Sequence, residues 1–374
     1  RPRLTQTPAA PSSCPARMKR LLKFGEITAT LRQLALWTLL AVPVGLLAGS
    51  ASALFLWSLD RVTQTRWDHP WLLWLLPVAG FAVGWVYLKI GGRAGDGTPL
   101  ILEQIHQPGG GVPARMAPLV LLGTLVTHLC GGSAGREGTA VQMGGSLAGA
   151  LGRLFRLKPD DVRVLLIAGV AAGFGSVFGT PLAGAVFALE VLVIGRTHRG
   201  AFLPVLVASL VGDVTCTTWG IHHANYHIAI GANSGLHAAI TPALLAKATL
   251  AALAFGLAAR GFAEISHAVQ SIFKRVIAYA PLRPVAGGLI VIALVYVSGT
   301  RDYLGIGVSS PDPAATTLLS AFNPDGATPW SWAWKFLFTV ITLASGFKGG
   351  EVTPLFFIGA TLGHTLAVVL GAPV

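Results

Sequence analysis

Three glycine-rich stretches in this sequence each run directly into an apolar segment. They read AGDGTPLILEQIH from Ala94, GGSAGREGTAVQMGGSLAGALG from Gly131 and GFKGGEVTPLFFIGATLG from Gly346. Glycine lets the backbone amides at the start of a helix approach a ligand closely, and the helix dipole adds positive potential there. Because amides and dipoles attract anions without a fixed cation, these stretches predict the binding of a small anion.

The side chains in these stretches that could hold a proton or donate a hydrogen bond are Glu137, Glu351, Thr353 and one of Asp96 or Thr98. A carboxylate inside a membrane is functional by default, although Glu137 could also serve as an acid at a helix N-terminus. Glu351 could handle protons, coordinate the anion or act as such a helix-terminal acid, and Thr353 could donate to an anion or cap a helix. Between the last two we favour Thr98, because an aspartate would repel an anion at low dielectric constant.

Composition places these stretches in a membrane. The chain has 374 residues, 53% of them apolar and 11% charged, whereas an ordinary soluble domain carries about 25% charged residues. The formal net charge of +12 comes from scattered basic residues that form no stripe, which indicates contact with membrane lipid and not with nucleic acid. The three cysteines, Cys14, Cys130 and Cys216, are too few and too scattered to indicate a disulfide framework or a metal site.

Apolar segments follow one another along the chain, and glycine or proline interrupts many of them. Several are shorter than the ~20 residues of a spanning helix, a pattern typical of transporters whose sites form where helices begin or end at mid-membrane. Such breaks are tolerated only inside protein or beside a water-filled cavity. The sequence therefore predicts an all-α polytopic membrane protein with apolar segments at residues 31–59, 70–90, 115–130, 138–155, 161–178, 181–195, 201–218, 239–274, 284–298, 330–345 and 353–371.

Residues 1–30 are expected to form a disordered cytosolic segment. Residues 1–17 are rich in proline, serine and threonine and have no apolar period, and the sequence from Met18 reads like a true start. Lys19, Arg20 and Lys23 precede the first apolar run, which under the positive-inside rule places the N-terminus in the cytosol. That apolar run is too long for the hydrophobic core of a cleaved signal peptide.

Three motifs carry a resemblance to a known family. Residues 135–139 read GREGT, residues 173–190 read GFGSVFGTPLAGAVFALE and residues 349–354 read GGEVTP. In this order they are similar to the GREGP motif, the helix pair that follows it and the GxFxP motif of the CLC family of chloride channels and proton-coupled anion transporters. The resemblance extends from about Leu31 to Gly371.

The resemblance implies a CLC-type inverted-repeat fold with broken helices, divided here into a first half at 31–198 and a second half at 199–374. It implies a multi-pass protein of the cell membrane, the inner membrane in a bacterium, that forms a homodimer, binds no cofactor and is not an enzyme. Glu137 corresponds to the family's gating glutamate, which occupies an anion site as a carboxylate and swings out when protonated. The residues expected to surround the anion are Gly135, Arg136, Gly138, Thr98, Gly350, Glu351, Val352 and Thr353.

Departures from the family pattern bear on the substrate. The family's GSGIP motif has become Gly95-Asp96-Gly97-Thr98-Pro99, without the serine that lines the central chloride site. The string KGGEVTP resembles the fluoride-selective branch, so the resemblance implies fluoride export coupled to protons. Glu190 matches the first of two acidic residues that end a helix in the chloride/proton exchangers, whereas Val191 replaces the internal proton glutamate. Glu190 is a candidate for the proton path, and a chloride channel or a chloride/proton exchanger is the alternative function.

Three other patterns support rival functions less well. Residues 131–135 match the G-x-S-x-G motif of serine hydrolases, but an apolar helical run precedes them where that motif needs a strand. Two Glu-x-x-His pairs, Glu103 with His106 and Glu264 with His267, are compatible with a membrane di-metal enzyme, which would need further inward glutamates. A solvated loop explains a histidine cluster better than metal binding does, and the cluster consists of His222, His223, His227 and His237.

Family members continue beyond the helix that here ends at Val374. We therefore expect this chain to lack C-terminal helices of the pore and the tyrosine that coordinates the central anion, and the 374 residues by themselves not to transport.

Overall fold

The computed structural model describes residues 16–190, 201–223 and 241–372. Within this part of the chain the regular structure is helical, and the one isolated β-bridge joins Gly135 to Gly350. Five helical stretches are long and apolar enough to cross a membrane, namely Leu34–Asp68, Pro70–His106, Pro159–Phe178, Pro242–Val276 and Val352–Leu370. The helices are α1 (Ala16–Asp68), α2 (Leu76–Val86), α3 (Thr98–His106), α4 (Met116–Leu129), α5 (Glu137–Leu154), α6 (Pro159–Phe178), α7 (Pro181–Glu190), α8 (Phe202–Thr218), α9 (Pro242–Val276), α10 (Leu282–Ser298), α11 (Ser331–Ser345) and α12 (Val352–Leu370).

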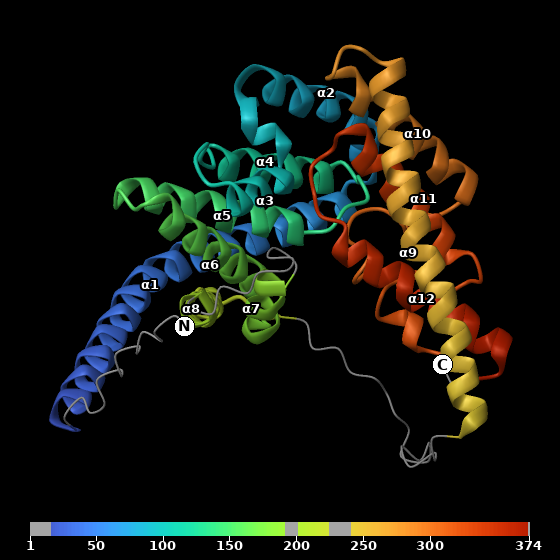
Figure 1. Ribbon diagram of the computed structural model, residues 1–374. Coiled ribbons are helices and arrows are strands. Elements are labelled where there is room, and N and C mark those ends of the chain that lie inside the picture. Colours follow the sequence, from blue (N-terminus) through green and yellow to red (C-terminus); the bar gives the residue numbers. More distant parts are fainter. Residues whose placement is uncertain (1–15, 191–200, 224–240, 373–374) are drawn as a thin grey trace, which may run out of the picture.

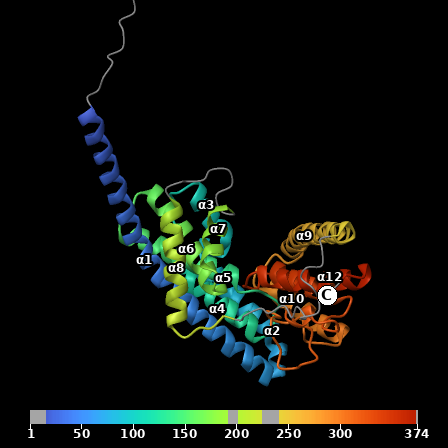
Figure 2. The ribbon, with the colours of Figure 1, turned by 90° about the horizontal axis from the view of Figure 1, so that it is seen from below.

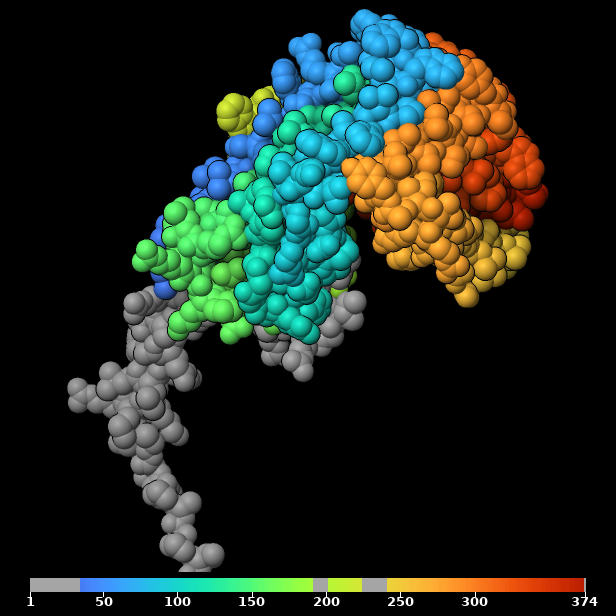
Figure 3. All heavy atoms as spheres, turned by 90° about the horizontal axis from the view of Figure 1, so that it is seen from above, coloured from blue at the N-terminus to red at the C-terminus, as the bar shows by residue number. Residues whose placement is uncertain are grey.

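The helices form two groups that lie side by side (Figures 1 and 2). One group contains α1 and α3 to α8, and the other contains α9 to α12. Helix α2 follows α1 in sequence but packs on α10, and the space-filling view shows its atoms against those of the second group (Figure 3). Helix α8, which the sequence division assigned to the second half, packs against α1, α6 and α7.

Small residues set the helix packing, as is usual where lipid provides no hydrophobic force between helices. Gly45 of α1 fits against α8 so closely that an added Cβ would lie 2.7 Å from the carbonyl oxygen of Ala208. Gly144 of α5 and Gly169 of α6 pack in the same way, and a Cβ on Gly169 would lie 2.6 Å from that of Ala148. The glycines that the sequence contains in excess therefore serve as contact points between helices as well as turns.

The expected disorder of residues 1–30 is wrong from Ala16 onward, because α1 begins there. The segment from Ala16 to Lys23 contains Ala, Arg, Met, Lys and Leu, which are strong helix formers, and the proline that could have ended the helix lies before it at Pro15. Helix propensity and continuity with the apolar run of α1 therefore outweigh the polar composition. Residues 1–15 lie outside the described residues.

Candidate anion-binding site

The first turns of α5 and α12 meet at the two glycine motifs. The backbone N–H of Gly135 donates to the carbonyl oxygen of Gly350 at 2.6 Å, and the N–H of Gly350 donates back to Gly135 at 2.8 Å. Glycine is required here, because a Cβ on Gly350 would lie 2.7 Å from the backbone nitrogen of Gly138. Two stretches separated by about half of the chain thus place two helix N-termini, and their unpaired amides, at one point.

Glu137 is the first residue of α5 and is buried, with 1% of its surface exposed. Its Oε1 accepts a hydrogen bond from the hydroxyl of Thr353, a buried residue in the first turn of α12. The carboxylate also faces the backbone amides of Arg136, Glu137 and Thr353. Its Oε2 is buried and has no hydrogen-bond partner among the described residues. The carboxyl group of Glu137 therefore lies where two helix dipoles converge, an arrangement that favours negative charge.

Arg136 connects this point to a cavity of about 490 Å³. Its guanidinium stacks on Phe178 at 5.9 Å from the ring centroid, and its buried Nε has no hydrogen-bond partner among the described residues. The cavity is also lined by Arg66, His222 and His223, with Asp60 as the carboxylate among its lining residues. Two arginines at one opening create a positive potential that favours the approach of anions.

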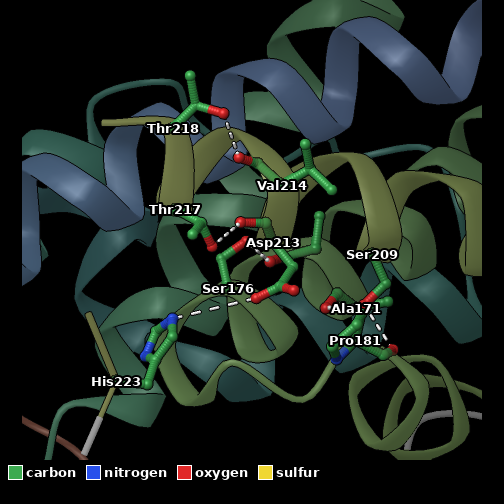
Figure 4. A network of polar contacts seen from close by, with 10 residues as sticks. Ala171, Ser176, Pro181, Ser209, Asp213, Val214, Thr217, Thr218 and His223 are labelled. Carbon is green, nitrogen blue, oxygen red and sulfur yellow. Dashed lines mark hydrogen bonds and ion pairs between the residues drawn. The ribbon is translucent and has the colours of Figure 1, made fainter. Parts of the chain in front are cut away.

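A network of polar contacts joins α8 to its neighbours and to His223, which lines this cavity (Figure 4). The hydroxyl of Ser209 donates to the carbonyl oxygens of Ala171 and Pro181, which fixes α8 against α6 and α7. Nε2 of His223 lies 4.0 Å from Oδ1 of Asp213. Burial lowers the pKa of His223, and the nearby Asp213 carboxylate opposes this effect. Two other members of the predicted histidine cluster, His227 and His237, lie outside the described residues.

Thr98 approaches the site from α3. Nε2 of Gln142, five residues after Glu137 on α5, lies 3.4 Å from the Thr98 hydroxyl oxygen, to which it donates. Asp96, the other candidate for this position, is exposed in the turn before α3. The hydroxyl, and not the carboxylate, therefore contacts the helix that begins at Glu137.

The structure does not bring all of the predicted residues together. Val352 begins α12, but the preceding Glu351 is exposed and lines a different cavity of about 390 Å³ together with His267 and Gln270 of α9. Glu190 is exposed at the end of α7, and Val191 lies outside the described residues.

The family model for voltage gated chloride channels matches residues 79–373. The chain belongs to the CLC family. A chloride/fluoride channel protein of Pseudomonas syringae pv. tomato is 50% identical over 349 residues, which cover 91% of this chain and 74% of that protein. The crystal structure of a CLC-type fluoride/proton antiporter matches with a TM-score of 0.83 and 34% identity, over 91% of this chain and 83% of that one. A slow cyanobacterial Cl⁻/H⁺ antiporter matches with a TM-score of 0.72 at 21% identity, over 89% and 79% of the two chains, and supports the fold alone.

The predicted all-α CLC fold is confirmed, and so is the prediction that the chain is an anion transporter or channel of the membrane and not an enzyme. The patterns behind the rival functions have structural roles in this CLC protein. The hydroxyl of Ser133 is buried in a hydrogen-bonding contact with Thr339 at 3.0 Å, in a loop that follows a helix and not a strand. Glu103 pairs with Arg93 and Glu264 with Arg260, and the described residues contain no group of three or more potential metal ligands.

Three polar residues of this CLC protein, one buried and two partly buried, escaped the sequence analysis. Gln142 contacts Thr98, and Lys335 lies fully buried in α11 and donates to the carbonyl oxygens of Tyr303 and Gly305 at 3.1 and 2.7 Å. Lys348 precedes the GGEVTP motif and packs on Tyr87. Each lysine is a single charge in or beside an apolar segment, a signal that could have marked it.

Proposed function

We propose that this CLC protein exports fluoride from the cell in exchange for protons. The observation that carries the proposal is the contact between the Thr353 hydroxyl and the Glu137 carboxylate at the joined N-termini of α5 and α12. A carboxylate and a halide ion need the same partners, namely positive potential and hydrogen-bond donors. Glu137 and the transported anion therefore compete for one position.

The donors at this position favour fluoride over chloride. Fluoride is small and strongly hydrated, so a site must offer close and strong donors to replace its water shell. Thr353 adds a hydroxyl to the backbone amides near Glu137, and Thr98 supplies a second hydroxyl on the α3 side. The likeness to a chloride/fluoride channel protein and to a fluoride/proton antiporter supports the same substrate.

Proton coupling follows from the competition between the Glu137 carboxylate and the anion for one set of hydrogen-bond donors. As a carboxylate, Glu137 occupies the donors and blocks the anion; once protonated, it loses its charge and no longer competes for the helix N-termini. A proton is thus taken up when the anion enters, and release of the anion allows the carboxylate to return. Arg136 and the other cations of the 490 Å³ cavity would concentrate anions beside the gate.

The test is reconstitution of the purified full-length protein, and not of the 374 residues alone, in liposomes loaded with fluoride or chloride. An ion-selective electrode records anion efflux, and a pH electrode records proton movement in the same vesicles. We expect fluoride efflux to exceed chloride efflux and to be accompanied by proton uptake. In Glu137→Gln, whose amide has no charge to cycle, proton movement should stop.

A matched control is Glu103→Gln, which removes the same charge from an exposed ion pair with Arg93 and should leave both fluxes unchanged. Equal fluoride and chloride rates would replace the proposal with a chloride transporter. Unchanged proton uptake in Glu137→Gln would remove Glu137 from the gating role.

Topology and assembly are part of the proposal. The basic residues Lys19, Arg20 and Lys23 support a cytosolic N-terminus, and the family resemblance supports a homodimer in the inner membrane of a bacterium. Labelling of a single cysteine placed near the N-terminus, in intact and opened cells, tests the orientation. Cross-linking of the protein in its native membrane tests the dimer.

A further inference from the structure

Lys348 carries a charge in the loop that leads to α12. It lies two residues before Gly350, and its aliphatic stem passes so close to α4 that a Cβ on Gly123 would lie 2.9 Å from its Cγ. The ammonium lies 4.0 Å from the ring centroid of Tyr87, which begins the turn Tyr87–Gly91 after α2. The side chain is thus held between α4 and the Tyr87–Gly91 turn that follows α2.

The positive charge of Lys348 faces an aromatic ring and has no ion-pair partner among the described residues. The carboxylate whose charge acts on it is that of Asp96, in the exposed turn before α3. The face of an aromatic ring stabilises a cation but does not replace three hydrogen-bond acceptors. An ionisable side chain in such surroundings within a membrane protein is a candidate functional group.

The surroundings of Lys348 connect it to the Glu137 site from the α3 side. A Cβ on Gly95 would lie 3.9 Å from Cδ1 of Tyr87, the ring that the Lys348 ammonium faces, and Thr98, whose hydroxyl accepts from Gln142, follows Gly95 by three residues. Gln142 lies five residues beyond Glu137 on α5, a rise of about 7.5 Å along the helix. The Lys348 ammonium thus lies on the ring that borders the turn leading into Thr98, the residue that contacts α5 from the α3 side.

We propose that Lys348 binds the transported anion on the Asp96 side of the Glu137 site, as a hydrogen-bond donor and positive charge. This inference rests on the proposed function. An ammonium is a compact, strongly hydrated charge with three donors, which suits small, hard fluoride better than chloride. When no anion is bound, Tyr87 and the field of Asp96 hold the charge. Lys348 is therefore a determinant of both affinity and selectivity.

The test measures fluoride and chloride efflux from liposomes as a function of anion concentration. Lys348→Met keeps the length and apolar stem of the side chain but removes the charge and its donors. We expect the KM for fluoride to rise by about tenfold or more, the loss of one charge-assisted hydrogen bond, with a smaller change for chloride. Lys348→Arg should retain most of the affinity. The control is Lys247→Met, which removes a lysine that donates to the carbonyl oxygen of Gly371 and should not change KM.

A chemical rescue separates charge from folding. In Lys348→Cys, an aminoethyl thiosulfonate reagent restores a positive charge on the folded protein, whereas a methyl reagent of the same chemistry does not. The rescue uses a Cys14→Ser background, in which the remaining native cysteines, Cys130 and Cys216, are buried, and intact mass confirms a single modification. Recovery of fluoride affinity with the charged reagent alone supports the inference. Fluoride KM values equal to wild type in monodisperse Lys348→Met, or equal recovery with both reagents, overturn it. Absence of fluoride transport in the wild-type protein refutes the proposed function instead.

Discussion

Replacing Thr353 by valine removes one hydroxyl from the candidate site and changes little else. The two side chains have nearly the same shape, and Thr353 is buried with 2% of its surface exposed. In the structure its hydroxyl donates to Glu137, so the substitution takes a donor from the carboxylate when Glu137 occupies the site. When the anion occupies the site, the same donor is lost to the anion.

The expected loss of fluoride affinity follows from the strength of the hydrogen bond that the Thr353 hydroxyl donates to a charged acceptor. A bond to a charged group contributes about 1.5 to 3 kcal/mol, and about 1.4 kcal/mol corresponds to a factor of ten. We therefore expect fluoride itself to bind up to about 10- to 150-fold more weakly to Thr353→Val. The KM should rise by less than this, because the competing Glu137 carboxylate loses the same donor. Chloride is larger and a weaker acceptor, so its affinity should fall less. The ratio of fluoride to chloride transport should decrease.

The assay compares the KM for fluoride and chloride efflux in liposomes. Thr361→Val is the matched control, because Thr361 lies two turns further along α12, is fully buried and donates to Phe357 of its own helix at 2.8 Å. It should leave both KM values at the wild-type level. If Thr353→Val retains the wild-type fluoride KM and selectivity, the hydroxyl does not bind the anion and our assignment of Thr353 fails.

Other substitutions test the backbone, the link between the halves and a buried histidine. Gly350→Ala should abolish anion transport, because the added Cβ would lie 2.7 Å from both Glu137 Oε2 and the backbone nitrogen of Gly138, whereas Gly359→Ala on the same helix meets nothing within 4 Å and should transport normally. Thr342→Val deprives the backbone N–H of Ser133 of its acceptor at 3.1 Å, so thermal unfolding in detergent should show a loss of about 1–3 kcal/mol; an unchanged melting temperature would contradict this. Burial lowers the pKa of His223, so the unfolded state binds more protons and stability falls as pH drops below about 6.5. His223→Asn should therefore lose less stability than wild type between about pH 7 and pH 5, and parallel pH profiles would rule out this contribution.

The helices could largely be predicted from the sequence, because apolar runs bounded by glycine and proline mark them directly. The predicted segment at 161–178 is the helix Pro159–Phe178, and that at 284–298 is Leu282–Ser298. The sequence predicted the long helix Ala16–Asp68 only from residue 31 onward. Composition marks the apolar segment of a helix but does not show how far the helix extends beyond it.

The pairing of distant residues could not be predicted in the same way. Glycine motifs indicate that two helix N-termini bind an anion, but the reciprocal hydrogen bonds of Gly135 with Gly350 depend on how the two halves pack. Glu351 shows the limit of the motif argument, because it belongs to the same string as Thr353 but faces α9. Adjacent residues at a helix start point in different directions, so a motif assigns a position and not a contact.

The convergence of two helix N-termini restricts how the site can operate. Unpaired amides at membrane depth cost several kcal/mol each when nothing accepts from them, so an empty site is the least favourable state. In the structure the Glu137 carboxylate occupies this position, with Thr353 as a donor from the opposite helix. The carboxylate should therefore leave only when an anion takes its place, and the two events are linked by the donors they share. Because protonation of Glu137 frees these donors for the anion, a protonatable residue and the anion site should coincide at Glu137.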